Sequence, residues 1–105
     1  MRTYHDSIER YRKTLEIAVK YDAVPMILET LVRVAELFDQ QDERELATQI
    51  VTLTLCYPMR QSLKTRAREL LDQLEVTVCP GVIADAVEMT ARITLDEMVE
   101  AILVA

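Results

Sequence analysis

Glycine is almost absent from this chain, which has one glycine among 105 residues. Glycine ordinarily makes up about 7% of a protein, because phosphate-binding loops, tight hairpin turns and most β architectures need its conformational freedom. Helices do not need it, since glycine destabilises their interiors. The glycine content therefore predicts an all-α fold and excludes glycine-rich nucleotide-binding loops.

Length and charge narrow the class of protein further. A chain of 105 residues that is 50% hydrophobic predicts a single domain over residues 1–105, with a core that needs no disulfide or metal. The formal net charge of −6 repels phosphate backbones and argues against nucleic-acid binding. The longest uncharged stretch, residues 46–59, is too short and polar for a membrane span, and the N-terminus lacks the apolar segment of a secretory signal. We therefore expect a cytoplasmic protein without a membrane segment.

Apolar residues recur at helical spacing along the chain and predict about six antiparallel helices with short connections. The β-branched run Ile50–Leu55 would also suit a buried strand, but no second strand lies nearby to pair with it. Residues 24–39 hold more apolar positions than one stripe can contain, so this helix is expected to pack on two sides. The predicted helices span residues 6–21, 24–39, 43–56, 61–75, 80–93 and 95–104.

Several residues mark the expected starts of helices. Pro80 suits the first turn of a helix, where its missing N–H costs nothing. Thr94 and Glu97 have the spacing of a capping box, in which each side chain bonds to the other residue's backbone N–H. Asp42 and Glu45 resemble the same arrangement ahead of residues 43–56. These signals place helix starts just after residues 42, 79 and 94.

Two parts of the sequence match each other at a constant offset. Pro25-Met26 recurs as Pro58-Met59, and apolar positions within residues 17–38 fall in register with apolar positions within residues 50–71. The offset is 33 residues, and a period of about 33 to 34 residues, with each unit a helix pair closed by a proline turn, is typical of a stacked helical solenoid.

The stretch Ile27–Pro58, which reads helix, Asp-Gln-Gln-Asp turn, helix and proline, resembles a degenerate tetratricopeptide repeat. From Ala23 onward the chain resembles the last helical repeats of large bacterial signalling regulators, the ATP-dependent transcriptional activators. Tyr57-Pro58, the segment Thr65–Leu71 and the proline-started helix after it carry this resemblance. The resemblance implies a right-handed stack of helix hairpins, whose end repeats act as a cap or as an oligomerisation surface.

The sequence offers no residues with the spacing of a catalytic, cofactor or metal site, so we expect neither enzyme activity nor a cofactor. His5, the one histidine, has no partner for acid–base chemistry. Cys56 and Cys79 lack metal-ligand spacing and are expected to be reduced thiols packed in the core. Cys79, just ahead of a helix start, is the better candidate for a reactive thiol. The acidic residues within 39–45 lack the glycine of a calcium loop and predict a solvated turn.

Six residues form the candidate partner surface. Three basic residues four apart make the one positive stripe, and three apolar or aromatic residues lie near the ends of predicted helices. The alternative is that the basic residues form an ordinary solvated face and that the apolar residues belong to the core, where Phe38 is also expected. The six residues are Met26, Phe38, Tyr57, Arg60, Lys64 and Arg68.

Together these patterns predict a non-catalytic interaction or oligomerisation module that binds a protein partner or a second copy of itself through apolar helix faces. The alternative is a transcription-associated regulatory protein or fragment that contacts other regulators or nucleic acid, for which a basic recognition helix would be the signature. A third hypothesis, an enzyme or small-ligand carrier, requires convergent polar groups that the inward-facing stripes lack. We therefore expect no small-molecule substrate.

Overall fold

The computed structural model describes residues 4–104, and this part of the chain forms six α-helices and no strand. The predicted all-α fold is confirmed, and the run Ile50–Leu55 is helical up to Thr54. The third helix ends earlier than expected because the following residues turn toward Pro58, which disfavours a helical residue before it. The helices are α1 (Tyr4–Lys20), α2 (Val24–Gln40), α3 (Arg44–Thr54), α4 (Gln61–Thr77), α5 (Pro80–Thr90) and α6 (Leu95–Val104).

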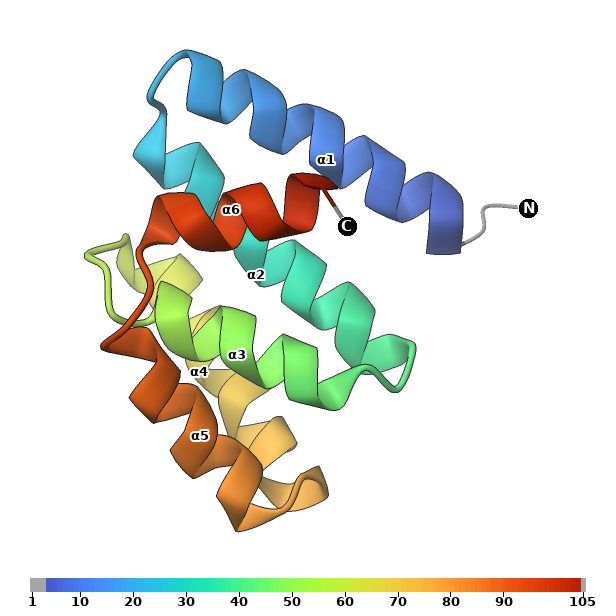
Figure 1. Cartoon of the computed structure of the whole chain (residues 1–105), viewed down its shortest axis with the longest axis vertical. Helices are drawn as coiled ribbons and strands as arrows, with labels where there is room; N and C mark the ends of the chain where they lie inside the picture. The colour runs from blue at the N-terminus through green and yellow to red at the C-terminus, as the bar shows by residue number, and fades with distance from the viewer. Residues whose placement is uncertain (1–3, 105) are drawn as a thin grey trace.

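Two helices occupy the centre of the fold (Figure 1). α3 packs against α2, α4, α5 and α6, while α2 packs against α1, α3 and α4. The expectation that α2 packs on more than one side is therefore confirmed. Its buried residues, which form much of the core, are Ile27, Leu28, Thr30, Leu31, Val32, Val34, Ala35 and Phe38.

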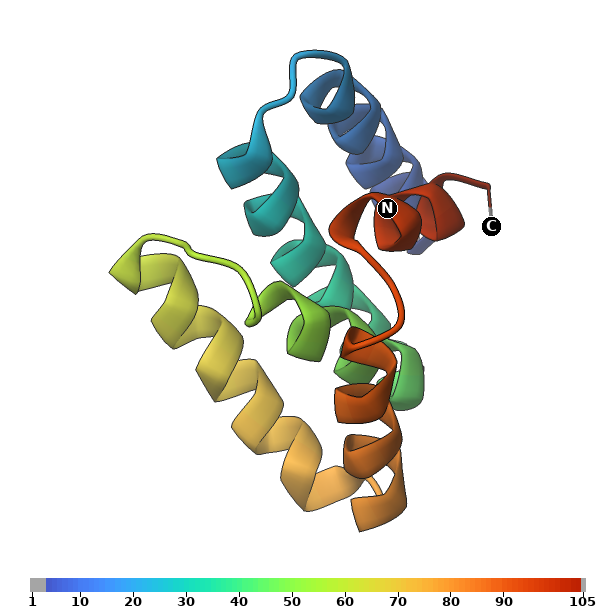
Figure 2. The ribbon, with the colours of Figure 1, turned by 60° about the vertical axis from the view of Figure 1, so that its left-hand side comes forward.

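The last helix turns back across the molecule to the first. α6 packs against α1 and α3, and it lies beside α1 in Figure 1 and Figure 2. In a regular stack of hairpins it would pair with α5 instead. Of the described residues of α5, Ala86 alone is buried, whereas α1 and α3 bury large side chains such as Leu15 and Ile50. The apolar face of α6 therefore covers more apolar surface by lying on α1 and α3.

Two aspartates end helices in the way glycine usually does. Asp22 and Asp42 have φ angles of 52° and 62°, in the left-handed region. After α1, the Ala23 N–H donates to the Ala18 carbonyl at 2.8 Å. After α2, the Glu43 N–H donates to the Phe38 carbonyl, also at 2.8 Å. This pattern is the Schellman motif, in which one residue is left-handed. Aspartate adopts that conformation more readily than most residues do. The scarcity of glycine is thus compatible with sharp turns between helices.

The two predicted capping arrangements have different outcomes. The Thr94 N–H donates to Glu97 Oε1 at 3.0 Å and the Glu97 N–H donates to Thr94 Oγ1 at 3.2 Å, which confirms the capping box of α6. The predicted cap by Asp42 and Glu45 is wrong, because α3 starts after Glu43 without a side-chain capping bond. A capping aspartate needs extended backbone, and Asp42 is left-handed because it ends α2.

Substitutions at Asp22 should test its left-handed conformation, since the side chain is exposed. We expect Asp22→Val to lower the free energy of unfolding by about 1–2 kcal/mol, because a β-branched residue is strained at positive φ. Asp22→Gly should leave it unchanged or raise it by up to about 0.5 kcal/mol, because glycine is unstrained there. Urea denaturation of both variants measures the difference. Equal stability of the two variants would contradict a left-handed residue 22.

Candidate interaction surface

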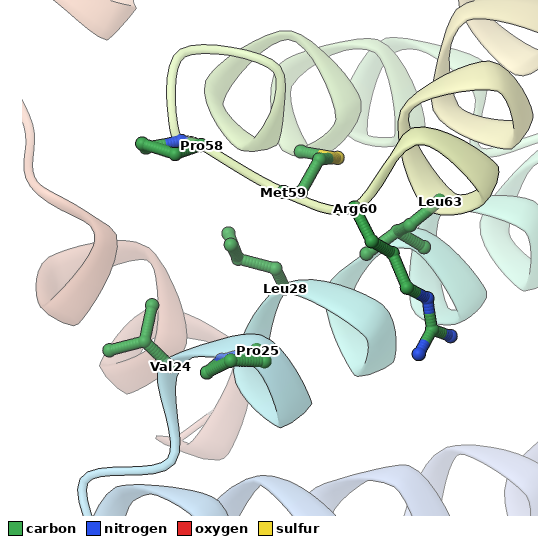
Figure 3. Close-up of a pocket in the computed structure, with 7 residues that line it drawn as sticks. All are labelled: Val24, Pro25, Leu28, Pro58, Met59, Arg60 and Leu63. Carbon is green, nitrogen blue, oxygen red and sulfur yellow. The ribbon is translucent and has the colours of Figure 1, made fainter.

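The starts of α2 and α4 lie side by side and enclose a small pocket, the α2–α4 pocket (Figure 3). Its volume is about 190 Å³, and Arg60 is its one charged lining residue. Pro25 and Pro58, which occupy matching positions in the two similar parts of the sequence, both line it. The lining residues are Val24, Pro25, Leu28, Pro58, Met59, Arg60 and Leu63.

Two ion pairs hold α4 against α2. Arg60 Nη2 lies 2.6 Å from Glu29 Oε1. Arg66 donates from Nε and Nη2 to the two carboxylate oxygens of Glu36, at 2.8 Å and 2.5 Å. Such two-bond pairs fix the geometry of both side chains, and the hydrogen bond to Glu36 raises the already high pKa of Arg66. Local sequence patterns do not predict this pair, because its partners lie on different helices and far apart in the chain.

The predicted positive stripe is on the surface, but its three members differ in their surroundings. Arg60 precedes the first turn of α4 and is paired with Glu29. Lys64 and Arg68 are exposed, and neither has an ion-pair partner among the side chains of residues 6–104. Lys64 also lies in the first turn of α4, at the positive end of the helix dipole, where a cation is disfavoured. Helix stability therefore does not account for its charge.

The three apolar and aromatic candidates are placed differently from one another. Met26 is exposed on α2. Phe38 is 7% exposed and belongs to the core, so it is not part of any surface. Tyr57 is half-buried, and its hydroxyl accepts a hydrogen bond from the Leu95 N–H at 2.9 Å. Tyr57 thus connects the turn after α3 to the start of α6, which gives it a structural role.

Removing the Tyr57 hydroxyl should weaken this connection. We expect Tyr57→Phe to lower the free energy of unfolding by about 1 kcal/mol, because the Leu95 N–H loses its acceptor. Tyr21→Phe, which removes the hydroxyl of an exposed tyrosine, serves as the matched control and should change little. Urea denaturation compares the two. A Tyr57→Phe variant as stable as the control would show that the bond contributes nothing to stability.

Exposed apolar side chains are concentrated where α1 turns into α2, a feature that hydrophobic periodicity does not predict. Helical spacing places Val19 on the same face as the buried Leu15, four residues earlier, yet Val19 is 45% exposed. Ile17 and Tyr21 lie four residues apart, so they share one face of α1, and the other residues of that face are polar. This spacing is the one sequence feature that indicates an exposed apolar surface here. We call this set the α1–α2 corner; it consists of Ile17, Val19, Tyr21, Val24 and Met26.

A second groove, the α1–α6 groove, lies on the other side of the start of α2, between the end of α1 and α6. Its volume is about 380 Å³. Three exposed carboxylates, Asp22, Asp96 and Glu100, surround an apolar floor, and none of them has an ion-pair partner among the described residues. Within residues 6–104, whose side chains the structure describes, no group of three histidine, cysteine or acidic residues is placed to hold a metal ion. The lining residues are Val19, Asp22, Ile27, Asp96, Val99, Glu100 and Leu103.

The cysteines are on the surface, so the expectation that they pack in the core is wrong. Cys56 and Cys79 are both free and exposed. Cys56 lies in the turn after α3, and Cys79 is the residue that precedes α5, where its side chain makes no capping bond. Both thiols are exposed because they lie at helix ends, outside the packed faces of the helices. The side chain of His5 lies outside the described part of the structure.

No protein-family model matches this chain, and no curated protein and no solved structure matches it. In the described part of the chain, no helix is long and apolar enough to cross a membrane.

Proposed function

We propose that this chain is a non-catalytic interaction module of tetratricopeptide-like type, which binds a protein through the α1–α2 corner and the two hollows beside it. The observation that carries the proposal is the clustering of exposed apolar side chains. Among the described residues, more than half of the large apolar side chains that are exposed lie in the corner. A concentration of exposed apolar side chains around one turn is a feature of surfaces where proteins interact.

The surroundings of the corner support binding of a protein over catalysis. Figure 2 shows the start of α2 between the start of α4 and α6, so the corner lies between the α2–α4 pocket and the α1–α6 groove. The pocket is apolar apart from Arg60, and the groove has an apolar floor with charges at its edge. An apolar centre with a charged rim is the usual composition of a protein interface.

The arrangement of α2 and α4 supports the tetratricopeptide-like part of the proposal. Helices one repeat apart lie side by side in a helical stack. α2 and α4 pack together, and the matching Pro25 and Pro58 line the same pocket. We further propose that the module works in the cytoplasm, as part of bacterial signalling or transcription regulation.

Loss of apolar contacts at the corner should weaken binding. The full chain is immobilised and incubated with an extract of the source cells. Tagged copies of the chain are added to this extract, so that binding of a second copy is detected as well. We expect Tyr21→Ser with Met26→Ser to reduce the captured protein at least about tenfold, because both exposed side chains lie in the corner. Val76→Ser with Val87→Ser, at two other exposed apolar positions, should capture as much as the unmodified chain.

Circular dichroism verifies that both double variants remain folded. Capture that is equal in the corner variant and the control variant, or absent from the unmodified chain, would disprove the proposed function.

A further inference from the structure

We infer that the protein bound at the α1–α2 corner is a second copy of this chain, related to the first by a two-fold axis through the corner. The inference rests on the proposed function and adds the identity of the partner. It comes from the order of charges across the corner.

The two sides of the corner carry opposite charges. On the α4 side, Lys64 and Arg68 are exposed, and on the α6 side, Asp96 and Glu100 are exposed. In the described part of the chain, none of these four residues has an ion-pair partner. Figure 2 shows that the start of α4 and α6 lie on opposite sides of the start of α2. From α4 to α6, this end of the molecule therefore carries a basic edge, then the corner, whose exposed side chains are apolar apart from Lys20 and Asp22, and then an acidic edge.

A surface with this order is complementary to itself. Rotation by 180° about an axis through its apolar centre brings the basic side of one copy against the acidic side of the other, and this happens twice in one closed dimer. The starts of α2 of the two copies then lie near the axis. A foreign partner would need an acidic edge, an apolar centre and a basic edge in matching order. A second copy of this chain presents these features in that order by symmetry.

The position of Lys64 agrees with a partner that supplies negative charge. In the isolated chain Lys64 lies at the positive end of the α4 dipole, and α4 has no acidic residue in its first turn. Carboxylates of a second copy, such as Asp96 and Glu100, would offset this unfavourable field. Charges that complement each other across an interface also select the partner and set the register of binding.

Charge reversal tests the inference directly. Sedimentation equilibrium of the full chain should show a dimer at low ionic strength that weakens as salt is added. Lys64→Glu with Arg68→Glu, and separately Asp96→Lys with Glu100→Lys, should each weaken self-association about 30-fold or more, because like charges then face each other twice.

An equimolar mixture of the two double variants should form a dimer with one copy of each. In the mixed dimer, one contact pairs the new glutamates of the first variant with the new lysines of the second variant. The other contact pairs the unchanged carboxylates of the first variant with the unchanged basic residues of the second, so both contacts join opposite charges. Since the chain starts from a net charge of −6, both variants remain negatively charged, and attraction between net charges does not drive the pairing. Asp72→Lys with Glu75→Lys is the matched control, because it reverses two exposed carboxylates in the second half of α4 and should dimerise as the unmodified chain does.

The inference is overturned if the unmodified chain is monomeric at all concentrations, if neither charge reversal weakens the dimer, or if the mixture does not restore it. Should Asp96→Lys with Glu100→Lys lose its helical circular dichroism, Asp96→Asn with Glu100→Gln replaces it, and weaker dimerisation with a smaller salt dependence is then the expected result. A monomeric chain that still captures a foreign protein through the corner would refute the inference and leave the proposed function standing. Absence of both self-association and capture would refute both.

Discussion

The Ile50→Asp variant is expected to lose its cooperative unfolding transition and most of its helical circular dichroism at 25 °C. Ile50 is fully buried in α3, the helix that packs against four others. An aspartate there would be a buried charge without a cation, at a cost of about 5 kcal/mol or more. That cost approaches the total stability of a small domain, which is about 5–15 kcal/mol.

Leu46→Asp is the matched control, one turn earlier in the same helix. The hydrophobic periodicity places Leu46 on the inward stripe with Ile50, but in the structure Leu46 is 37% exposed. We therefore expect Leu46→Asp to stay folded and to lose at most about 1 kcal/mol of stability. A folded Ile50→Asp variant, or an unfolded Leu46→Asp variant, would contradict the orientation of α3.

The second large effect is expected for Val99→Asp, which should detach α6 from the rest of the fold. Val99 is 2% exposed in the face of α6 that lies on α1 and α3. A carboxylate in this contact should lower the free energy of unfolding by about 3 kcal/mol. Hydrogen exchange should then accelerate at the amides of α6 and α1 and remain unchanged in α5. Val104→Asp, at a position that is 78% exposed, should alter neither stability nor exchange.

Hydrogen exchange in the Val99→Asp variant also distinguishes two arrangements of the chain. In a regular stack of helix hairpins, α6 would protect α5, so loss of α6 would accelerate exchange there. Faster exchange in α5 with continued protection of α1 would show that α6 pairs with its neighbour in the sequence. Faster exchange in α1 would establish that the chain closes on its first helix.

The candidate surface could be predicted only in part. The spacing of Lys64 and Arg68 identified an exposed basic stripe, because residues four apart share one face of a helix. Phe38 could not be assigned from the sequence, since an apolar residue near a helix end can lie in the core or on the surface. The α1–α2 corner was missed because the exposure of Val19 depends on where α6 lies, and hydrophobic periodicity in one helix contains no information about a helix at the other end of the chain.

The sequence by itself determined the six helices, the proline that starts α5 and the capping box that starts α6. These features depend on interactions between residues at most four apart, so local patterns are sufficient to specify them. Only the tertiary structure decided that α6 covers α1, that Pro25 and Pro58 meet at one pocket, and that the corner remains exposed between two oppositely charged sides. These outcomes depend on how apolar faces from distant parts of the chain compete to cover one another. Burial is non-directional and proportional to area, so that competition is settled only once all the helices are in place.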